Sequence, residues 1–177
     1  MAPIQYELLE ANAPNPADSV HELTSICVIQ CQCGGFLLQL RDDIEGIWFP
    51  GMWGGFGGSL EPGESPVQAM QRELEEELGI LFTGSKPQFF CYVLHKYEAV
   101  FKVEHIFFYR LPCGLDDLVL QEGQQMACLS YEEIVSGSAF SSLLQEHREV
   151  AGPIVHLFLE KPDLGSLFVG GVASRFS

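Results

Sequence analysis

The chain has 177 residues, a length that suits one domain with a full hydrophobic core. Its hydrophobic content of 47% excludes wholesale disorder, and its net charge of −15 disfavours binding to nucleic acids or anionic membranes. It contains no apolar run of membrane-spanning length and no signal-peptide pattern at the N-terminus, so we expect a soluble cytoplasmic protein.

The first third of the chain predicts a loose arm followed by a β-hairpin. Residues 1–21 are rich in Pro, Asn and Ala, which is typical of an irregular N-terminal arm. Residues 24–33 are β-branched and apolar, Gly34 and Gly35 form a turn, and residues 36–41 resume an apolar strand. Arg41 ends this second strand beside two aspartates, with which it can form a surface ion pair.

The six cysteines do not follow a disulfide or zinc pattern. Cys27, Cys31 and Cys33 fall within the apolar strand-like run, and the chain has no paired Cys-x-x-Cys unit. Buried reduced thiols are therefore favoured over a zinc site.

A connection rich in glycine and aromatic residues covers residues 42–56. Long loops of this kind often line functional sites. Each of Trp48, Phe49, Trp53 and Phe56 is individually more typical of core packing, but we expect one of the four to stack on a base. The stretch contains neither a P-loop nor a well-spaced Gly-x-Gly-x-x-Gly motif.

The next stretch predicts an amphipathic helix. Ser65 is a good N-cap, Pro66 suits the first helical position, and Gln68 completes a capping box. Gly79 is placed to end the helix in a left-handed conformation. Helical spacing aligns an apolar stripe of four residues, Val67, Met70, Leu74 and Leu78.

Glu73, Glu76 and Glu77 share another arc of this helix. Like charges at this spacing repel, so the pattern predicts a divalent cation that offsets the repulsion. An all-oxygen ligand set suits Mg²⁺ or Mn²⁺ better than zinc. The turn at Gly57 and Gly58 can bring a backbone carbonyl close to the same ion.

An acidic helix is usually only a solvated face, and the wider pattern decides against that interpretation. The stretch follows Gly-x5-Glu-x7-Arg-Glu-apolar-x-Glu-Glu-x-Gly-apolar at Gly58, Glu64, Arg72, Glu73, Leu74, Glu76, Glu77, Gly79 and Ile80. It resembles the Nudix box at every specified position, and the chain resembles the MutT-like Nudix hydrolase superfamily over roughly residues 22–160. Many family members carry Pro-Gly-Gly before the box, where this chain has Phe56, Gly57 and Gly58.

The second half of the chain predicts two long strands, a short strand and three helical segments. Residues 88–95 and 100–111 read as strands in which His95 and His105 are structural residues. Residues 119–129 contain a short strand, Ser130 opens an acidic helix, and residues 141–149 and 154–160 have a helical pattern. We therefore expect one Nudix domain over residues 22–160, followed by a tail over 161–177.

The resemblance implies an α/β fold, a Nudix-type α/β/α sandwich with a mixed β-sheet. It also implies hydrolysis of a nucleoside diphosphate linked to another group, with Mg²⁺, or alternatively Mn²⁺, held by Glu73, Glu76, Glu77 and the carbonyl of Gly58. Glu122 lies in a Glu-Gly-Gln triplet that resembles a MutT loop, so it is expected as a further metal ligand, or else as a turn residue in solvent.

The same resemblance assigns the remaining roles. Glu76 or Glu122 is expected to act as the general base. Arg72 joins this catalytic set by orienting the ligands together with Glu64, and Gly79 gives structural support. The resemblance also raises a second interpretation of Arg41, as a contact to a phosphate or a base.

The triplet at Glu122 favours (deoxy)nucleoside triphosphates as substrates. Residues 92–96 lack the proline of many ADP-ribose-cleaving members, whereas Tyr97 has a spacing seen in dinucleoside polyphosphate hydrolases. Those two classes and nucleotide sugars remain alternatives, as does a non-catalytic nucleotide sensor, although the box has lost no carboxylate. Formation of a homodimer also remains an alternative.

Overall fold

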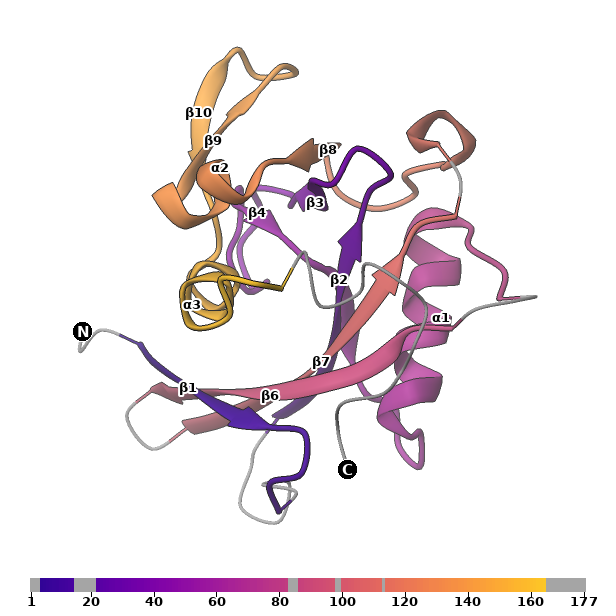
Figure 1. Cartoon of the computed structure of the whole chain (residues 1–177), viewed down its shortest axis with the longest axis vertical. Coiled ribbons are helices and arrows are strands. Elements are labelled where there is room, and N and C mark those ends of the chain that lie inside the picture. The colour runs from indigo at the N-terminus through magenta and orange to yellow at the C-terminus, as the bar shows by residue number, and fades with distance from the viewer. Residues whose placement is uncertain (1–3, 15–21, 83–85, 98–99, 113, 165–177) are drawn as a thin grey trace.

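A computed structural model describes residues 4–14, 22–82, 86–97, 100–112 and 114–164, with the side chains of residues 97, 100 and 101 excepted. Its centre is an eight-stranded sheet with helices on both faces (Figure 1). This arrangement confirms the predicted α/β sandwich. None of the described helices is long and apolar enough to cross a membrane.

The sheet is mixed. Its strands are β1 (Gln5–Glu10), β2 (Glu22–Gln30), β3 (Phe36–Leu40), β4 (Trp53–Gly54), β5 (Phe56–Ser59), β6 (Gln88–Tyr97), β7 (Val100–Arg110) and β8 (Gln125–Leu129). The main path runs β1-β6-β7-β2-β3-β4, with β5 paired to β2 and β8 paired to β3. Among the eight described strands of this sheet, β2 and β7 pair in parallel and the other pairs are antiparallel. The predicted hairpin and both predicted long strands are present.

Each face of the sheet has its own core. On one face, α1 (Pro66–Leu78) buries Met70, Leu74 and Leu78 against strand residues such as Phe56. On the other, α2 (Tyr131–Ser136) and α3 (Gly152–Glu160) pack with Trp53 and the rest of the second core. The sheet is therefore sandwiched between α1 and the α2–α3 pair (Figure 1).

The ends of α1 follow the sequence prediction. The Ser65 side chain accepts a hydrogen bond from the backbone of Gln68, whose side chain accepts one in return from the backbone of Ser65. Gly79 ends the helix at φ 68°, a conformation that glycine adopts without strain. The apolar stripe is shifted slightly, because Val67 is exposed and Ala69 is buried in its place.

Two predictions about the flanking segments need correction. Part of the expected N-terminal arm is strand β1, which pairs with β6 along its whole length, while residues 15–21 lie outside the described part. The expected helix over residues 141–149 is instead a hairpin of β9 (Ser138–Ser141) and β10 (Glu146–Glu149). Its exposed leucines, Leu143 and Leu144, lie in the turn, so they provide no buried face for a helix.

The domain also continues past residue 160. Leu164 is fully buried in the core beside α3, so the boundary predicted between domain and tail falls a few residues short. Residues 165–177 of the expected tail lie outside the described part of the chain.

Trp53 generates a stability prediction. It is fully buried, and its indole nitrogen donates to the carbonyl of Ala139 at 3.2 Å. Trp53→Ala should lower the free energy of unfolding by about 3–5 kcal/mol, because it leaves a large cavity and an unpaired carbonyl. Urea denaturation measures the loss. Leu143→Ala, an exposed-turn control, should change stability by less than about 0.5 kcal/mol. Equal effects of the two substitutions would contradict this description of the core.

Candidate active site

Arg72 joins three of the box glutamates. Its Nε and Nη2 atoms each donate to the Glu64 carboxylate at 3.0 Å, and Nη1 donates to Glu73 at 2.7 Å and to Glu76 at 3.2 Å. Nη2 also donates to the Ser59 carbonyl at 3.1 Å. The hydrogen bond from Arg72, helped by the backbone of Glu61, lowers the pKa of Glu64. The guanidinium therefore fastens the loop before α1 to the acidic face of the helix.

Glu77 points inward from α1 and is 2% exposed. One carboxylate oxygen accepts from the Gln39 side chain at 2.8 Å, and the other accepts from the backbone N–H of Gly57 at 2.7 Å. Burial, helped by the charges of Glu73 and Glu122, raises the pKa of Glu77 to about 8 despite these hydrogen bonds. This carboxylate holds α1, β3 and β5 together.

Glu73 lies directly against the glycine turn. A Cβ at Gly58 would come within 2.5 Å of a Glu73 carboxylate oxygen, so the close approach requires a residue without a side chain. Burial raises the pKa of Glu73, and Arg72 opposes this effect. The acidic face of the helix thus meets the backbone of β5 at Gly58.

Glu122 is carried to this cluster by a loop tied at both ends. The N–H of Gln121 donates to the Glu77 carbonyl at 2.9 Å, and that of Gln124 donates to the Leu40 carbonyl at 2.8 Å. Gly123, at φ 84°, makes the turn between them. The exposed carboxylate of Glu122 lies close enough to raise the pKa of Glu77 and of Glu73.

The donor set fits a hard divalent cation. Four glutamates supply only oxygen ligands, and burial raises the pKa of two of them, Glu73 and Glu77, so a bound cation would favour their ionised forms. Among the described residues, no three of these carboxylates place oxygens within 4.8 Å of one another, because Arg72 and Gln39 hold them apart.

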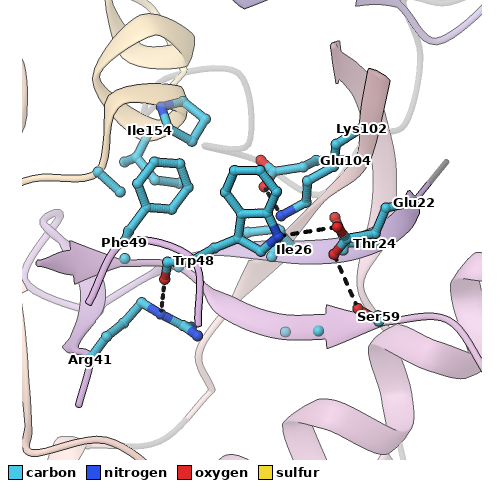
Figure 2. A pocket seen from close by; sticks show the side chains of 16 residues that line it. Glu22, Thr24, Ile26, Arg41, Trp48, Phe49, Ser59, Lys102, Glu104 and Ile154 are labelled. Carbon is cyan, nitrogen blue, oxygen red and sulfur yellow. Dashed lines mark hydrogen bonds and ion pairs between the residues drawn. The ribbon is translucent and has the colours of Figure 1, made fainter. Parts of the chain in front are cut away.

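A pocket opens beside this cluster (Figure 2). Trp48 and Phe49 form one side of it, Ile154 of α3 faces them, and Lys102 and Glu104 of β7 lie at its inner end. The backbone from Gly57 to Ser59 also lines the pocket. This wall is shared with the carboxylate cluster, because Glu73 touches Gly58.

Trp48 is held in place on three sides. Its indole nitrogen donates to Glu22 at 3.1 Å, its carbonyl accepts from Nε of Arg41 at 2.9 Å, and the Lys102 ammonium lies 4.7 Å from the ring centroid (Figure 2). The ring is therefore ordered before any ligand arrives, which lowers the entropy cost of stacking.

The chain matches a known family over most of its length. The family model described as the NUDIX domain matches residues 21–156. The chain belongs to the Nudix family. It is 30% identical over 125 residues to the nucleoside triphosphatase NudI of Escherichia coli O81 (strain ED1a), covering 66% of this chain and 87% of that protein. The resemblance inferred from residues 58–80 is confirmed.

Solved structures agree on the fold. The MutT protein from Methanosarcina mazei Go1 superposes with a TM-score of 0.57 at 19% identity, covering 82% of this chain and 97% of that one. DR0079 from Deinococcus radiodurans superposes with a TM-score of 0.60 at 13% identity, covering 87% and 98% of the two chains. The Nudix fold is thus shared at low sequence identity.

The other aromatic residues named from the sequence have different places. Trp53 and Phe56 are fully buried in the two cores, so neither can contact a ligand. Trp48 and Phe49 remain as candidates for stacking, and the side chain of Tyr97 lies outside the described part. Of the four aromatic residues from which one was expected to stack on a base, the adjacent residues Trp48 and Phe49 therefore remain.

Arg41 lines the pocket. Among the described residues it makes no ion pair with the neighbouring aspartates, and Asp43 pairs with Arg148 at 3.0 Å instead. The surface ion pair suggested by the sequence is therefore wrong. Arg41 instead lines the pocket, where its side chain can contact a bound ligand.

Sequence reasoning missed the polar inner end of the pocket. Glu104 is 3% exposed and pairs at 3.2 Å with both Lys102 and His95. Burial would raise the pKa of Glu104, but Lys102 and His95 outweigh it and lower the pKa to about 2. The Thr24 hydroxyl, also buried and pocket-lining, has no hydrogen-bond partner among the residues that the structure describes. The sequence signal that could have indicated this polar group is the pair Lys102 and Glu104, two charged residues at i and i+2 in an apolar strand.

Glu77 gives a pH-dependent prediction for the protein in chelator. Its folded-state pKa of about 8 lies above the ordinary value of 4.5, so the folded state holds a proton that the unfolded state releases. The resulting stabilisation is complete below pH 4.5 and is lost as the pH rises through about 8. Urea denaturation in EDTA between about pH 5 and 9 should therefore show falling stability.

Two comparisons sharpen this test. Glu77→Gln should flatten the pH dependence, because the amide does not titrate. Mg²⁺ should stabilise the native protein most at high pH, since the ion favours the ionised carboxylate. A native curve that runs parallel to that of Glu77→Gln would show that Glu77 titrates normally.

Proposed function

We propose that the protein is a Mg²⁺-dependent pyrophosphohydrolase that converts a (deoxy)nucleoside triphosphate and water to the monophosphate and pyrophosphate. The main observation is the wall from Gly57 to Ser59, which borders both the aromatic pocket and the carboxylate cluster. A base seated in the pocket leaves its phosphates beside Glu73. The similarity to a nucleoside triphosphatase supports the same substrate class.

The pocket has the chemistry that a nucleobase requires. Trp48 and Phe49 offer aromatic faces for stacking, opposite the apolar side chain of Ile154. Thr24, with its unpaired hydroxyl, and the Lys102–Glu104 pair offer hydrogen-bonding groups at the inner end. A flat ring with polar edges satisfies both sets of groups.

The carboxylate cluster would hold the cation that faces the phosphates. Glu73, Glu76, Glu77 and Glu122 would be its ligands, with the Gly58 carbonyl. When bound, Mg²⁺ supplies positive charge that offsets the phosphates and polarises phosphorus. This local charge is needed because the chain carries a net charge of −15, which repels a free nucleotide.

The chain's own residues then handle the proton and the geometry. Glu76, the most exposed of the helix carboxylates bonded to Arg72, accepts the proton of the attacking water, with Glu122 as the alternative base. Arg72 and Glu64 keep the acidic face in position. Arg41 reaches from β3 toward the same bound nucleotide.

Product analysis tests this function directly. Nucleoside triphosphates should release pyrophosphate with Mg²⁺ present and none in excess chelator. A panel that adds dinucleoside polyphosphates, nucleotide sugars and ADP-ribose ranks the alternative substrate classes. Binding of nucleotides without turnover of any would instead identify a sensor.

Glu76→Gln isolates the base. It should fold normally and lower kcat by about 10²- to 10⁴-fold, because the amide cannot accept the proton. Glu75→Gln is the matched control, since this neighbouring exposed glutamate makes no contact with Arg72 among the described residues. Steady-state pyrophosphate release and thermal unfolding measure both variants. Native-like turnover of Glu76→Gln would move the role to Glu122.

Trp48→Ala isolates the stacking surface. Loss of a base-stacking ring should raise KM on the order of 10- to 100-fold and leave kcat nearly unchanged. Phe140→Ala removes an exposed aromatic ring of the β9–β10 hairpin, so it should leave both constants as they are. An unchanged KM in Trp48→Ala would place the base outside this pocket.

A further inference from the structure

Three cysteines from two distant parts of the sequence, Cys31 with Cys33 and Cys128, meet in the fold. The Sγ atoms of Cys31, Cys33 and Cys128 all lie within 4.8 Å of one another, and those of Cys33 and Cys128 are 3.0 Å apart. None of the three belongs to the carboxylate cluster or to the aromatic pocket. The hydrolase described above therefore leaves this cluster without a role.

The β2–β3 turn presents two of the thiols. The N–H of Cys31 donates to the Gly35 carbonyl at 2.8 Å, and that of Gly34 donates to the Cys31 carbonyl at 3.0 Å. Gly34, at φ 92°, permits this tight turn. Cys31 and Cys33 are thus fixed on one short turn of backbone.

The third thiol comes from β8, which pairs with β3. Cys128 stands opposite Leu37, and a Cβ at Gly35 would come within 2.8 Å of its sulfur. The glycine thus leaves the space in which the Cys128 thiol sits against the turn. Residues 95 positions apart are brought together by the register of these strands.

The cluster is closed on its inner side and open on its outer side. Cys31 is 3% exposed and belongs to the core under α1, Cys128 is half-buried, and Cys33 is exposed. All three are free thiols, and the distance of 3.0 Å between Cys33 and Cys128 exceeds a disulfide bond length of about 2.05 Å. An ion can therefore enter from solvent past Cys33.

We propose that Cys31, Cys33 and Cys128 form a binding site for a thiophilic metal ion, Zn²⁺ or Cu⁺. Thiolates are soft ligands that select these ions over Mg²⁺. Zn–S bonds of about 2.3 Å in a tetrahedral site place sulfurs about 3.8 Å apart, within the spacing of this cluster. Zn²⁺ completes its coordination with a water on the open side, and the thiol protons pass to solvent.

Metal titration of the reduced full-length protein tests the site. After removal of bound metal with chelator, one Co²⁺ per chain should produce a thiolate-to-metal charge-transfer band in the near ultraviolet, and one Zn²⁺ should displace it. Competition with a chromogenic Cu⁺ chelator measures the second ion. The ion that binds more tightly identifies the preferred occupant.

Single substitutions connect the signal to these thiols. Cys33→Ser, at an exposed position, should keep the fold and weaken Zn²⁺ binding at least about 10-fold, as should Cys128→Ser. Cys91→Ser is the control, because Cys91 is buried in β6 outside the cluster. Pyrophosphate release with Mg²⁺, measured separately, should be retained in Cys33→Ser, so failure of either proposal is recognised independently.

Two results would overturn the proposal. The first is that the reduced protein binds neither Zn²⁺ nor Cu⁺, or that Cys33→Ser binds them as tightly as the native protein does. The other is a reduced protein without metal affinity whose air-oxidised form has lost the mass of two hydrogens, with the bond mapped to Cys33 and Cys128. That result would assign the pair to a disulfide.

Discussion

The burial of the Glu77 carboxylate is the interaction on which the rest of the site depends. A polar group removed from water must be hydrogen-bonded, and here Gln39 and the Gly57 N–H supply the partners. These bonds connect helix α1 to strands β3 and β5. Because the same helix carries Glu73, this side chain, together with the apolar core under α1, fixes the position of the acidic face relative to the sheet.

The glycines of β5 allow two different surfaces to share one stretch of backbone. On one side of this stretch Glu73 touches Gly58, and on the other the aromatic pocket opens. A side chain at Gly57, at φ 130°, would run into the Ser25 carbonyl at 2.0 Å, so the strand must also be bare there to pair with β2. The close packing of β5 and the access of a ligand to the pocket therefore both require glycine in this stretch.

Local chemistry was readable from the sequence, and long-range assembly was not. The spacing of Glu73, Glu76 and Glu77 fixes their common face through the geometry of a single helix. The pocket instead depends on the parallel register of β2 with β7, which places Thr24 opposite Glu104, and no local pattern encodes that register. The cysteine cluster likewise needs the pairing of β3 with β8. The prediction of a helix over residues 141–149 was wrong, because these residues belong to a hairpin in which β9 pairs with β10.

Arg72 already neutralises much of the acidic face before any ion arrives. A cation entering the cluster must displace or share hydrogen bonds that this guanidinium makes to Glu73 and Glu76. The free energy gained when the cation binds is therefore smaller than it would be at four carboxylates without hydrogen-bond partners. Such an ion would therefore be held less tightly, and Arg72 keeps its hydrogen bonds to the acidic face when no ion is bound.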